Sequence, residues 1–148
     1  MSQPPTSPAN AYLQRQLEQA SPTQAVLLLL DGAIKFTLQA KDAILRRDIQ
    51  ARYNANRRTV EIITFLLSQQ DERQGEAAVR LIRIFGGLLT QLLKIDFDND
   101  PALCDAVVAN LRQLRQGFAS LQPASNVVAA PGSTAAAPST PPKLAASA

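Results

Sequence analysis

The chain has 148 residues, with 15 Lys and Arg against 12 Asp and Glu and a formal net charge of +3. It has no His and one cysteine, Cys104, which excludes an internal disulfide and removes the commonest general base and metal ligand. The charge is modest for a nucleic-acid binder, and the longest apolar run is far shorter than the roughly 20 residues of a membrane span. We expect a soluble cytosolic protein that is not an enzyme, with no cofactor, no metal and no membrane insertion.

Residues 1–19 are polar, carry three prolines near their start and predict a flexible N-terminal arm. No Lys or Arg precedes Arg15, so we expect no secretory signal. The larger apolar side chains of the arm beyond Met1 are Tyr12, Leu13 and Leu17.

Residues 20–122 carry clear helix signals, and the first begins the segment. Ser21 is a good N-cap, Pro22 suits the first helical position, and Gln24 completes a capping box. We expect this first helix to continue to about Arg46.

Three further helices are predicted from apolar residues spaced three and four apart. They cover about 48–68, about 75–95, and a segment from Asp100 to about Leu121. The loops between them are short, which is typical of antiparallel neighbours. The predicted fold class is all-α: an antiparallel up-down four-helix bundle with a mobile N-terminal arm and a disordered C-terminal tail.

The tail covers residues 123–148 and consists mainly of Ala, Pro, Ser and Thr. Such a segment cannot bury enough apolar surface to offset the entropy of ordering it. We therefore expect it to be disordered.

The first helix has more apolar surface than one side of a bundle needs. On a helical wheel its apolar residues spread over roughly 220°, whereas a helix packed on one side needs little more than about 100°. Leu28 lies on the polar side, between the directions of Lys35 and Gln39. The surplus indicates either a deeply buried or self-associating helix, or a groove that receives an apolar helix of another chain.

The segment "ASPTQAVLLLLDGAIKF", residues 20–36, resembles the signature of the flagellin-specific export chaperones. That signature has Ser-Pro followed at a fixed distance by Asp-Gly-Ala, and the similarity extends over residues 10–121. The chain departs from it at Leu30, where an aromatic residue is usual, in "LIRIFGG" of the third helix, and in lacking Trp. The matching residues are Ala20, Ser21, Pro22, Gln24, Leu29, Asp31, Gly32 and Ala33.

The resemblance implies a chaperone that binds the disordered C-terminal segment of newly made flagellin in the cytosol. It would prevent premature polymerisation and present flagellin to a component of the flagellar type III export gate. It also implies an arm that folds over the binding groove, here through Tyr12, Leu13 and Leu17. The candidate flagellin-binding side chains are Leu28, Leu30, Ile34, Leu38, Ile62 and Leu66.

Two features leave alternatives open. Gly32 and the pair Gly86-Gly87 lie inside predicted helices, where they serve either close helix packing or room for a client backbone. The second feature is a basic strip, which has three interpretations. It is a solvated face, a contact surface for an acidic partner, or the basis of a rival function as a helical nucleic-acid-binding regulator that uses the Arg-rich face of the second and third helices. No helix-turn-helix supports the rival. The strip consists of Arg46, Arg47, Arg52, Arg57, Arg58, Arg73, Arg80 and Arg83.

Overall fold

The structure is a computed structural model that describes residues 8–121, apart from the side chains of residues 9, 10, 13 and 17. The predicted disordered tail, residues 123–148, lies outside the described residues, as do residues 1–7 of the arm. The described part is all-helical and contains no strand. Its elements are α1 (Pro8–Gln19), α2 (Pro22–Leu45), α3 (Ile49–Ser68), the short 3-10 helix η1 (Glu72–Gln74), α4 (Glu76–Asp98) and α5 (Pro101–Ala119).

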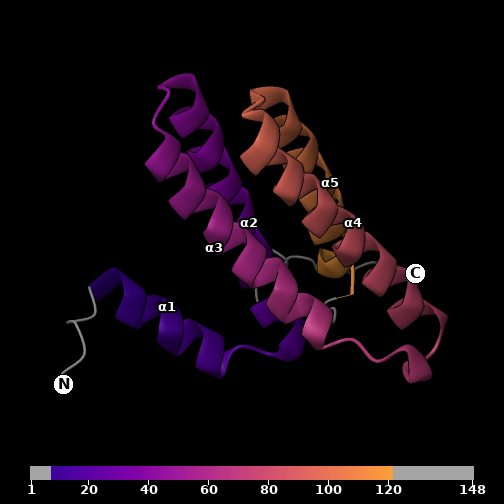
Figure 1. The fold of residues 1–148 in the computed structure, drawn as a ribbon. Helices are drawn as coiled ribbons and strands as arrows, with labels where there is room; N and C mark the ends of the chain where they lie inside the picture. Colours follow the sequence, from indigo (N-terminus) through magenta and orange to yellow (C-terminus); the bar gives the residue numbers. More distant parts are fainter. Residues whose placement is uncertain (1–7, 122–148) are drawn as a thin grey trace, which may run out of the picture.

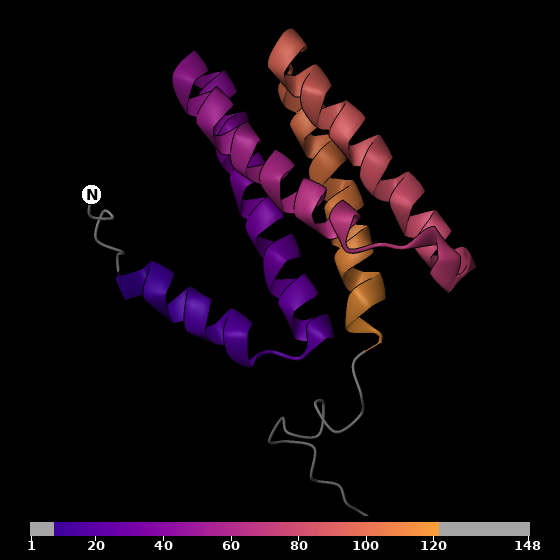
Figure 2. The same ribbon diagram turned by 60° about the horizontal axis from the view of Figure 1, so that its bottom comes forward.

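The helices α2 to α5 form the predicted four-helix bundle (Figure 1). Helix α2 packs against α3 and α5, and α4 packs against the same two helices, so every helix has two neighbours. Helix α1 touches only α2 among the described elements and lies beside the bundle, as Figure 2 shows. The all-α fold class is thus confirmed.

The starts of α2, α3 and α5 are fixed by side-chain caps that the sequence specifies, whereas α4 begins after Gly75 without one. The Ser21 hydroxyl accepts a hydrogen bond from the Gln24 backbone N–H, and the Gln24 side chain accepts one from the Ser21 N–H, both at 3.2 Å. Asp48 caps α3 and Asp100 caps α5 in the same way, through their carboxylates. Such caps satisfy backbone donors that have no partner inside the helix.

Two boundaries differ from the sequence prediction. Residues 8–19, expected as a flexible arm, form the helix α1, because Pro8 suits a helix start and the following Leu, Gln, Arg and Glu residues are good helix formers. Helix α4 continues beyond Ile95 to Asp98, where Asn99 ends it in the left-handed conformation with φ of 50°. Asn adopts this conformation more easily than most residues, so it can close a helix where glycine is absent.

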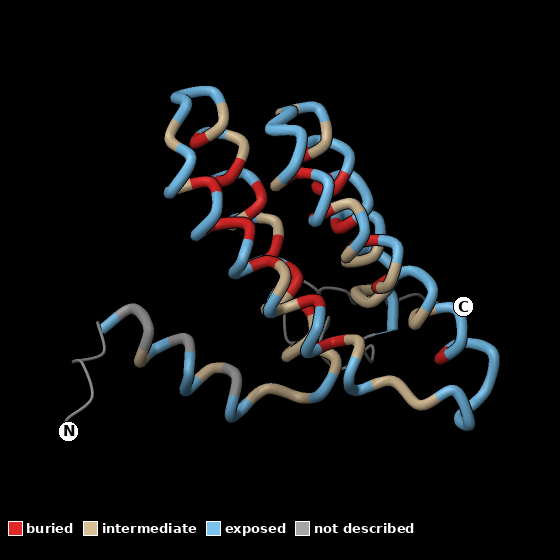
Figure 3. The backbone as a smooth tube through the Cα atoms, viewed as in Figure 1, coloured by how far each residue is buried: buried red, intermediate tan, exposed pale blue. Residues whose placement is uncertain are grey.

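The core lies along the bundle axis, on the inward sides of all four helices (Figure 3). Leu30, Ile63 and Leu111 are fully buried there, together with Phe85 of α4. Burying a side chain of this size contributes roughly 1.5–3 kcal/mol. Cys104 is also fully buried, and burial raises the pKa of its thiol to about 11, so it is a protonated core residue at neutral pH.

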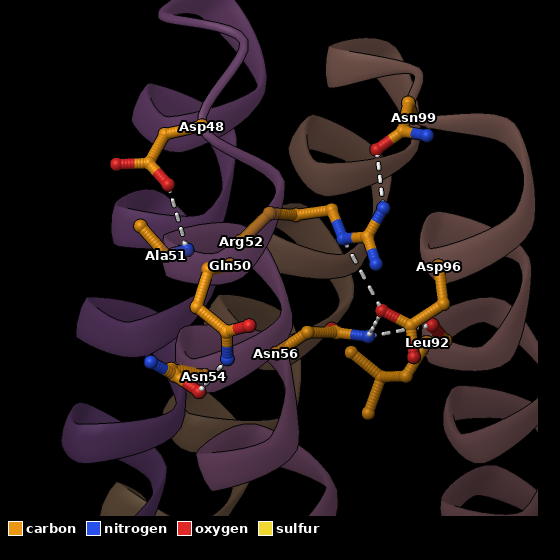
Figure 4. A network of polar contacts seen from close by, with 9 residues as sticks. All are labelled: Asp48, Gln50, Ala51, Arg52, Asn54, Asn56, Leu92, Asp96 and Asn99. Carbon is orange, nitrogen blue, oxygen red and sulfur yellow. Dashed lines mark hydrogen bonds and ion pairs between the residues drawn. The ribbon is translucent and has the colours of Figure 1, made fainter.

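A buried polar network joins α3 to α4 near one end of the bundle (Figure 4). Arg52 is only 7% exposed; it donates a hydrogen bond to the Asn99 side chain, and its Nε lies 3.4 Å from an Asp96 carboxylate oxygen. The fully buried Asn56 donates to the same carboxylate at 3.0 Å and to the Leu92 carbonyl at 2.9 Å. Asp96 therefore compensates a buried charge and a buried amide at once.

We predict that Asp96→Ala lowers the free energy of unfolding by about 2 kcal/mol, because it leaves the buried Arg52 guanidinium without its counter-charge. Asp98→Ala is the matched control, since Asp98 is exposed and forms no ion pair within residues 8–121. It should change stability by less than about 0.5 kcal/mol. Urea denaturation measures the free energy of unfolding of both variants. Equal losses would show that the network does not stabilise the contact between α3 and α4.

Candidate functional site

A hollow of about 880 Å³ lies on the outer side of α2 and the adjoining edge of α3. Ile34 and Leu38 of α2 contribute aliphatic side chains to it, and Phe36 contributes an aromatic ring. Carboxylates and basic groups surround them, so the hollow presents both signs of charge. The charged lining residues are Asp31, Lys35, Asp42, Arg46 and Arg58.

Several of these charges are already engaged within the protein. The Arg58 guanidinium lies 5.5 Å from the centre of the Phe36 ring, and the Lys35 ammonium lies 5.8 Å from it, both within the range of cation–π attraction. Arg115 of α5 donates hydrogen bonds to Asp31, one of them at 3.2 Å, and this raises the pKa of Arg115. Such exposed pairs contribute little to stability but hold the rim in place.

The structure separates the six candidate binding residues into two groups. Ile34 and Leu38 line the hollow, and Leu38 is 40% exposed. Leu28 is half-buried and is not among the side chains packed against the core. Leu30 and Leu66, in contrast, are 0% and 2% exposed, so a ligand that docks on the closed bundle cannot reach them.

Ile62 lies at the contact between α2 and α3 and does not line the hollow. Its Cδ1 would stand 3.4 Å from a Cβ added at Gly32, which is ordinary van der Waals contact. Gly32 therefore faces α3, but an ordinary contact does not require a glycine, and close packing there stays a prediction. Ile62 is half-buried and packs on the core, so only part of its surface is open to a ligand.

Tyr12, the described member of the predicted capping set, does not line the hollow. The Tyr12 side chain is 58% exposed, and its hydroxyl accepts a hydrogen bond from Gln16 within the same helix. The predicted capping role also names Leu13 and Leu17, whose side chains lie outside the described residues.

A second hollow, which the sequence analysis missed, runs between α4 and α5 with a volume of about 680 Å³. Leu81, Ile84 and Phe118 are among its apolar side chains, and Gly87 and Gly117 line it as well. The sequence signal was the glycine pair in the third predicted helix, of which Gly87 lines the hollow and Gly86 does not. A Cβ added at either glycine would meet nothing within 4 Å. Close packing, one of the two interpretations offered for Gly86-Gly87, is therefore wrong.

The basic strip does not form one open face. Arg52 is buried, Arg57 lies 3.4 Å from Glu61, and Arg73 lies 2.9 Å from Asp71. Arg46 pairs with two aspartates, and Arg58 covers an aromatic ring. A nucleic-acid interface needs clustered positive charge that is free to meet phosphates, so this arrangement removes the main basis for the rival function.

Between residues 8 and 121 there is no group of three or more acidic, Cys or His side chains that could hold a metal ion. No helix in that range combines the length and the apolarity needed to cross a bilayer.

The sequence profile described as "Flagellar protein FliS" matches residues 5–125. The chain belongs to the FliS family. This confirms the resemblance seen in residues 20–36 and places the chain among flagellar secretion chaperones, with an export chaperone role.

Curated relatives show how far this FliS-family chain has diverged. It is 29% identical over 111 residues to the flagellar secretion chaperone FliS of Vibrio cholerae, covering 73% of this chain and 80% of the relative. It is 29% identical over 107 residues to FliSB of Pseudomonas aeruginosa, covering 72% and 85%. It is 30% identical over 100 residues to FliS of Campylobacter jejuni, covering 67% and 78%.

The neighbouring residues Leu27 and Leu28 test the division of α2 into core and surplus. Leu27 is only 8% exposed, so Leu27→Asp should unfold the bundle at physiological temperature by burying a carboxylate without a partner. Leu28→Asp should cost less than about 1 kcal/mol, because Leu28 is half-buried outside the core cluster. Thermal melts of the two variants decide the matter, and a large loss for Leu28→Asp would show that all of α2 is core.

Proposed function

We propose that this FliS-family chain binds the C-terminal segment of flagellin in the cytosol, prevents its premature polymerisation and delivers it to the flagellar type III export apparatus. One observation carries the proposal: α2 completes its part of the core with Leu30 and other inward residues and still leaves Leu28 and Leu38 outside the core cluster. Ile34 packs against the core and also lines the hollow, so part of its surface adjoins Leu38. The core does not use Leu28 and Leu38, whereas an apolar client segment would cover them.

The physical task suits such a surface. A flagellin terminus is an amphipathic segment that pairs with other flagellins in a filament, so a chaperone must cover its apolar side without completing a filament. A disordered client gains order only when it meets a partner, and it can fold as short helices against a preformed apolar hollow. The caps and the α3–α4 network keep that hollow in place before the client arrives.

The arm is proposed as a cover for the empty hollow. Capping would require α1 to move over the hollow of α2 and α3, since Tyr12 is exposed here and does not line that hollow. Tyr12, Leu13 and Leu17 would then leave when flagellin binds. A component of the export gate would receive the loaded complex.

Calorimetry tests directly whether the chain binds flagellin. Titrating a C-terminal flagellin fragment from the source organism into the full chain should show one-to-one association with a negative heat-capacity change, the mark of apolar burial. The proposal fails if no flagellin of that organism associates at micromolar concentrations.

A matched pair of variants locates the site. Leu38→Asp should weaken flagellin binding at least tenfold, which takes only about 1.4 kcal/mol, because a carboxylate in the hollow would be desolvated under the client. Leu45→Asp is the control, since Leu45 is exposed on the same helix but does not line the hollow. Equal affinities of the two variants would place the client elsewhere.

A further inference from the structure

The groove between α4 and α5 is apolar along both walls. Its larger apolar side chains comprise three from α4, two from α5 and one from just beyond the end of α5. Most of these side chains also pack against the core, so the walls of the groove are held in place. They are Leu81, Ile84 and Leu88 of α4, Leu114 and Phe118 of α5, and Leu121 just beyond α5.

Two glycines deepen this groove without any need in the fold itself. Gly87 and Gly117 lie inside helices, where each costs about 1 kcal/mol relative to Ala. Neither has a positive φ, and a Cβ at either position would meet nothing within 4 Å. Neither backbone strain nor close packing accounts for them, whereas a ligand that enters the groove would use the space they leave.

The groove has a single sign of charge. Arg80 and Arg83 are the only charged side chains that line it, and neither forms an ion pair with any residue between 8 and 121. The hollow on α2 and α3 instead carries aspartates beside its basic residues. No residue lines both, so the two surfaces suit ligands of different charge.

The shape of the groove favours a helix over a small molecule. Its α4 wall extends from Ala77 to Gln91, which corresponds to about 21 Å of helix and roughly four turns. At one end the Asn110 amide donates a hydrogen bond to the Gln91 side chain at 3.1 Å and bridges the two walls.

We propose that this groove binds an amphipathic helix with acidic residues beside its apolar stripe, supplied by a partner protein other than the flagellin segment. The apolar stripe fills the space above Gly87 and Gly117, and the acidic residues meet Arg80 and Arg83. This site is separate from the hollow of the proposed function and is bound with flagellin present or absent.

The probe is a fluorescent 18-residue helical peptide with Leu spaced three and four apart and Glu on both flanks. The full chain should bind it with micromolar affinity in an anisotropy titration, and more weakly as salt rises. A peptide with Lys in place of Glu should bind at least tenfold more weakly. No binding of the acidic peptide, or equal binding of both peptides, overturns the proposal.

Adjacent glycines provide matched variants. Gly87→Leu fills the groove and should abolish peptide binding, whereas Gly86→Leu should preserve it, because Gly86 does not line the groove and also has free space around its Cβ position. Both replace a glycine inside a helix, so neither should lower the melting temperature. Loss of binding in both, or in neither, contradicts the assignment.

Charge is tested in the same way. Arg83→Glu should weaken the acidic peptide at least fivefold, and Arg112→Glu should not, since Arg112 is exposed on α5 outside the groove. A saturating flagellin fragment should leave the peptide bound. Displacement by flagellin would make the groove part of the client site and overturn the proposal, while calorimetric binding of flagellin itself is unaffected by this result.

Discussion

Each helix of the bundle can turn only a limited arc toward the common core, and this constraint shapes the rest of the molecule. An arc of little more than about 100° is enough for one side of a helix in a bundle. Leu30, Ile63, Phe85 and Leu111 fill that space and leave no exposed surface of their own. Apolar residues that fall outside the arc must face solvent or a partner, and they are the ones that point to function.

Some of these residues line two hollows of different character. On α2 and α3, aliphatic side chains lie among charges of both signs, several already engaged with neighbours. Between α4 and α5, apolar walls and the free space at two glycines lie beside two arginines, and no acidic side chain lines the groove. A chaperone that must hold a client and also be recognised by other components needs more than one surface. The closed core keeps both surfaces fixed, because neither depends on the other to form.

The sequence predicted the bundle well because its helix starts are local. Ser21, Asp48 and Asp100 each carry the carboxylate or hydroxyl that caps the next helix, and this requires only a few neighbouring residues. The binding residues were harder to predict. The sequence shows that Leu30 and Leu66 are apolar, but the helical spacing alone does not show that the folded bundle buries them. The groove beside Gly87 was missed since it depends on how α4 and α5 approach each other. For a similar reason the sequence did not show that the arginine strip is interrupted, since Arg52 lies beside Asp96 only in the folded chain.

The central claim is that the core is complete before any client binds, and hydrogen exchange tests it most directly. Exchange is followed by mass spectrometry in the free chain and in its complex with a C-terminal flagellin fragment. We predict that amides of α2 to α5 are already strongly protected in the free chain, and that the main change on binding is new protection in the flagellin segment. Strong protection of α2 to α5 that arises only in the complex would contradict the account, because the client would then be part of the core.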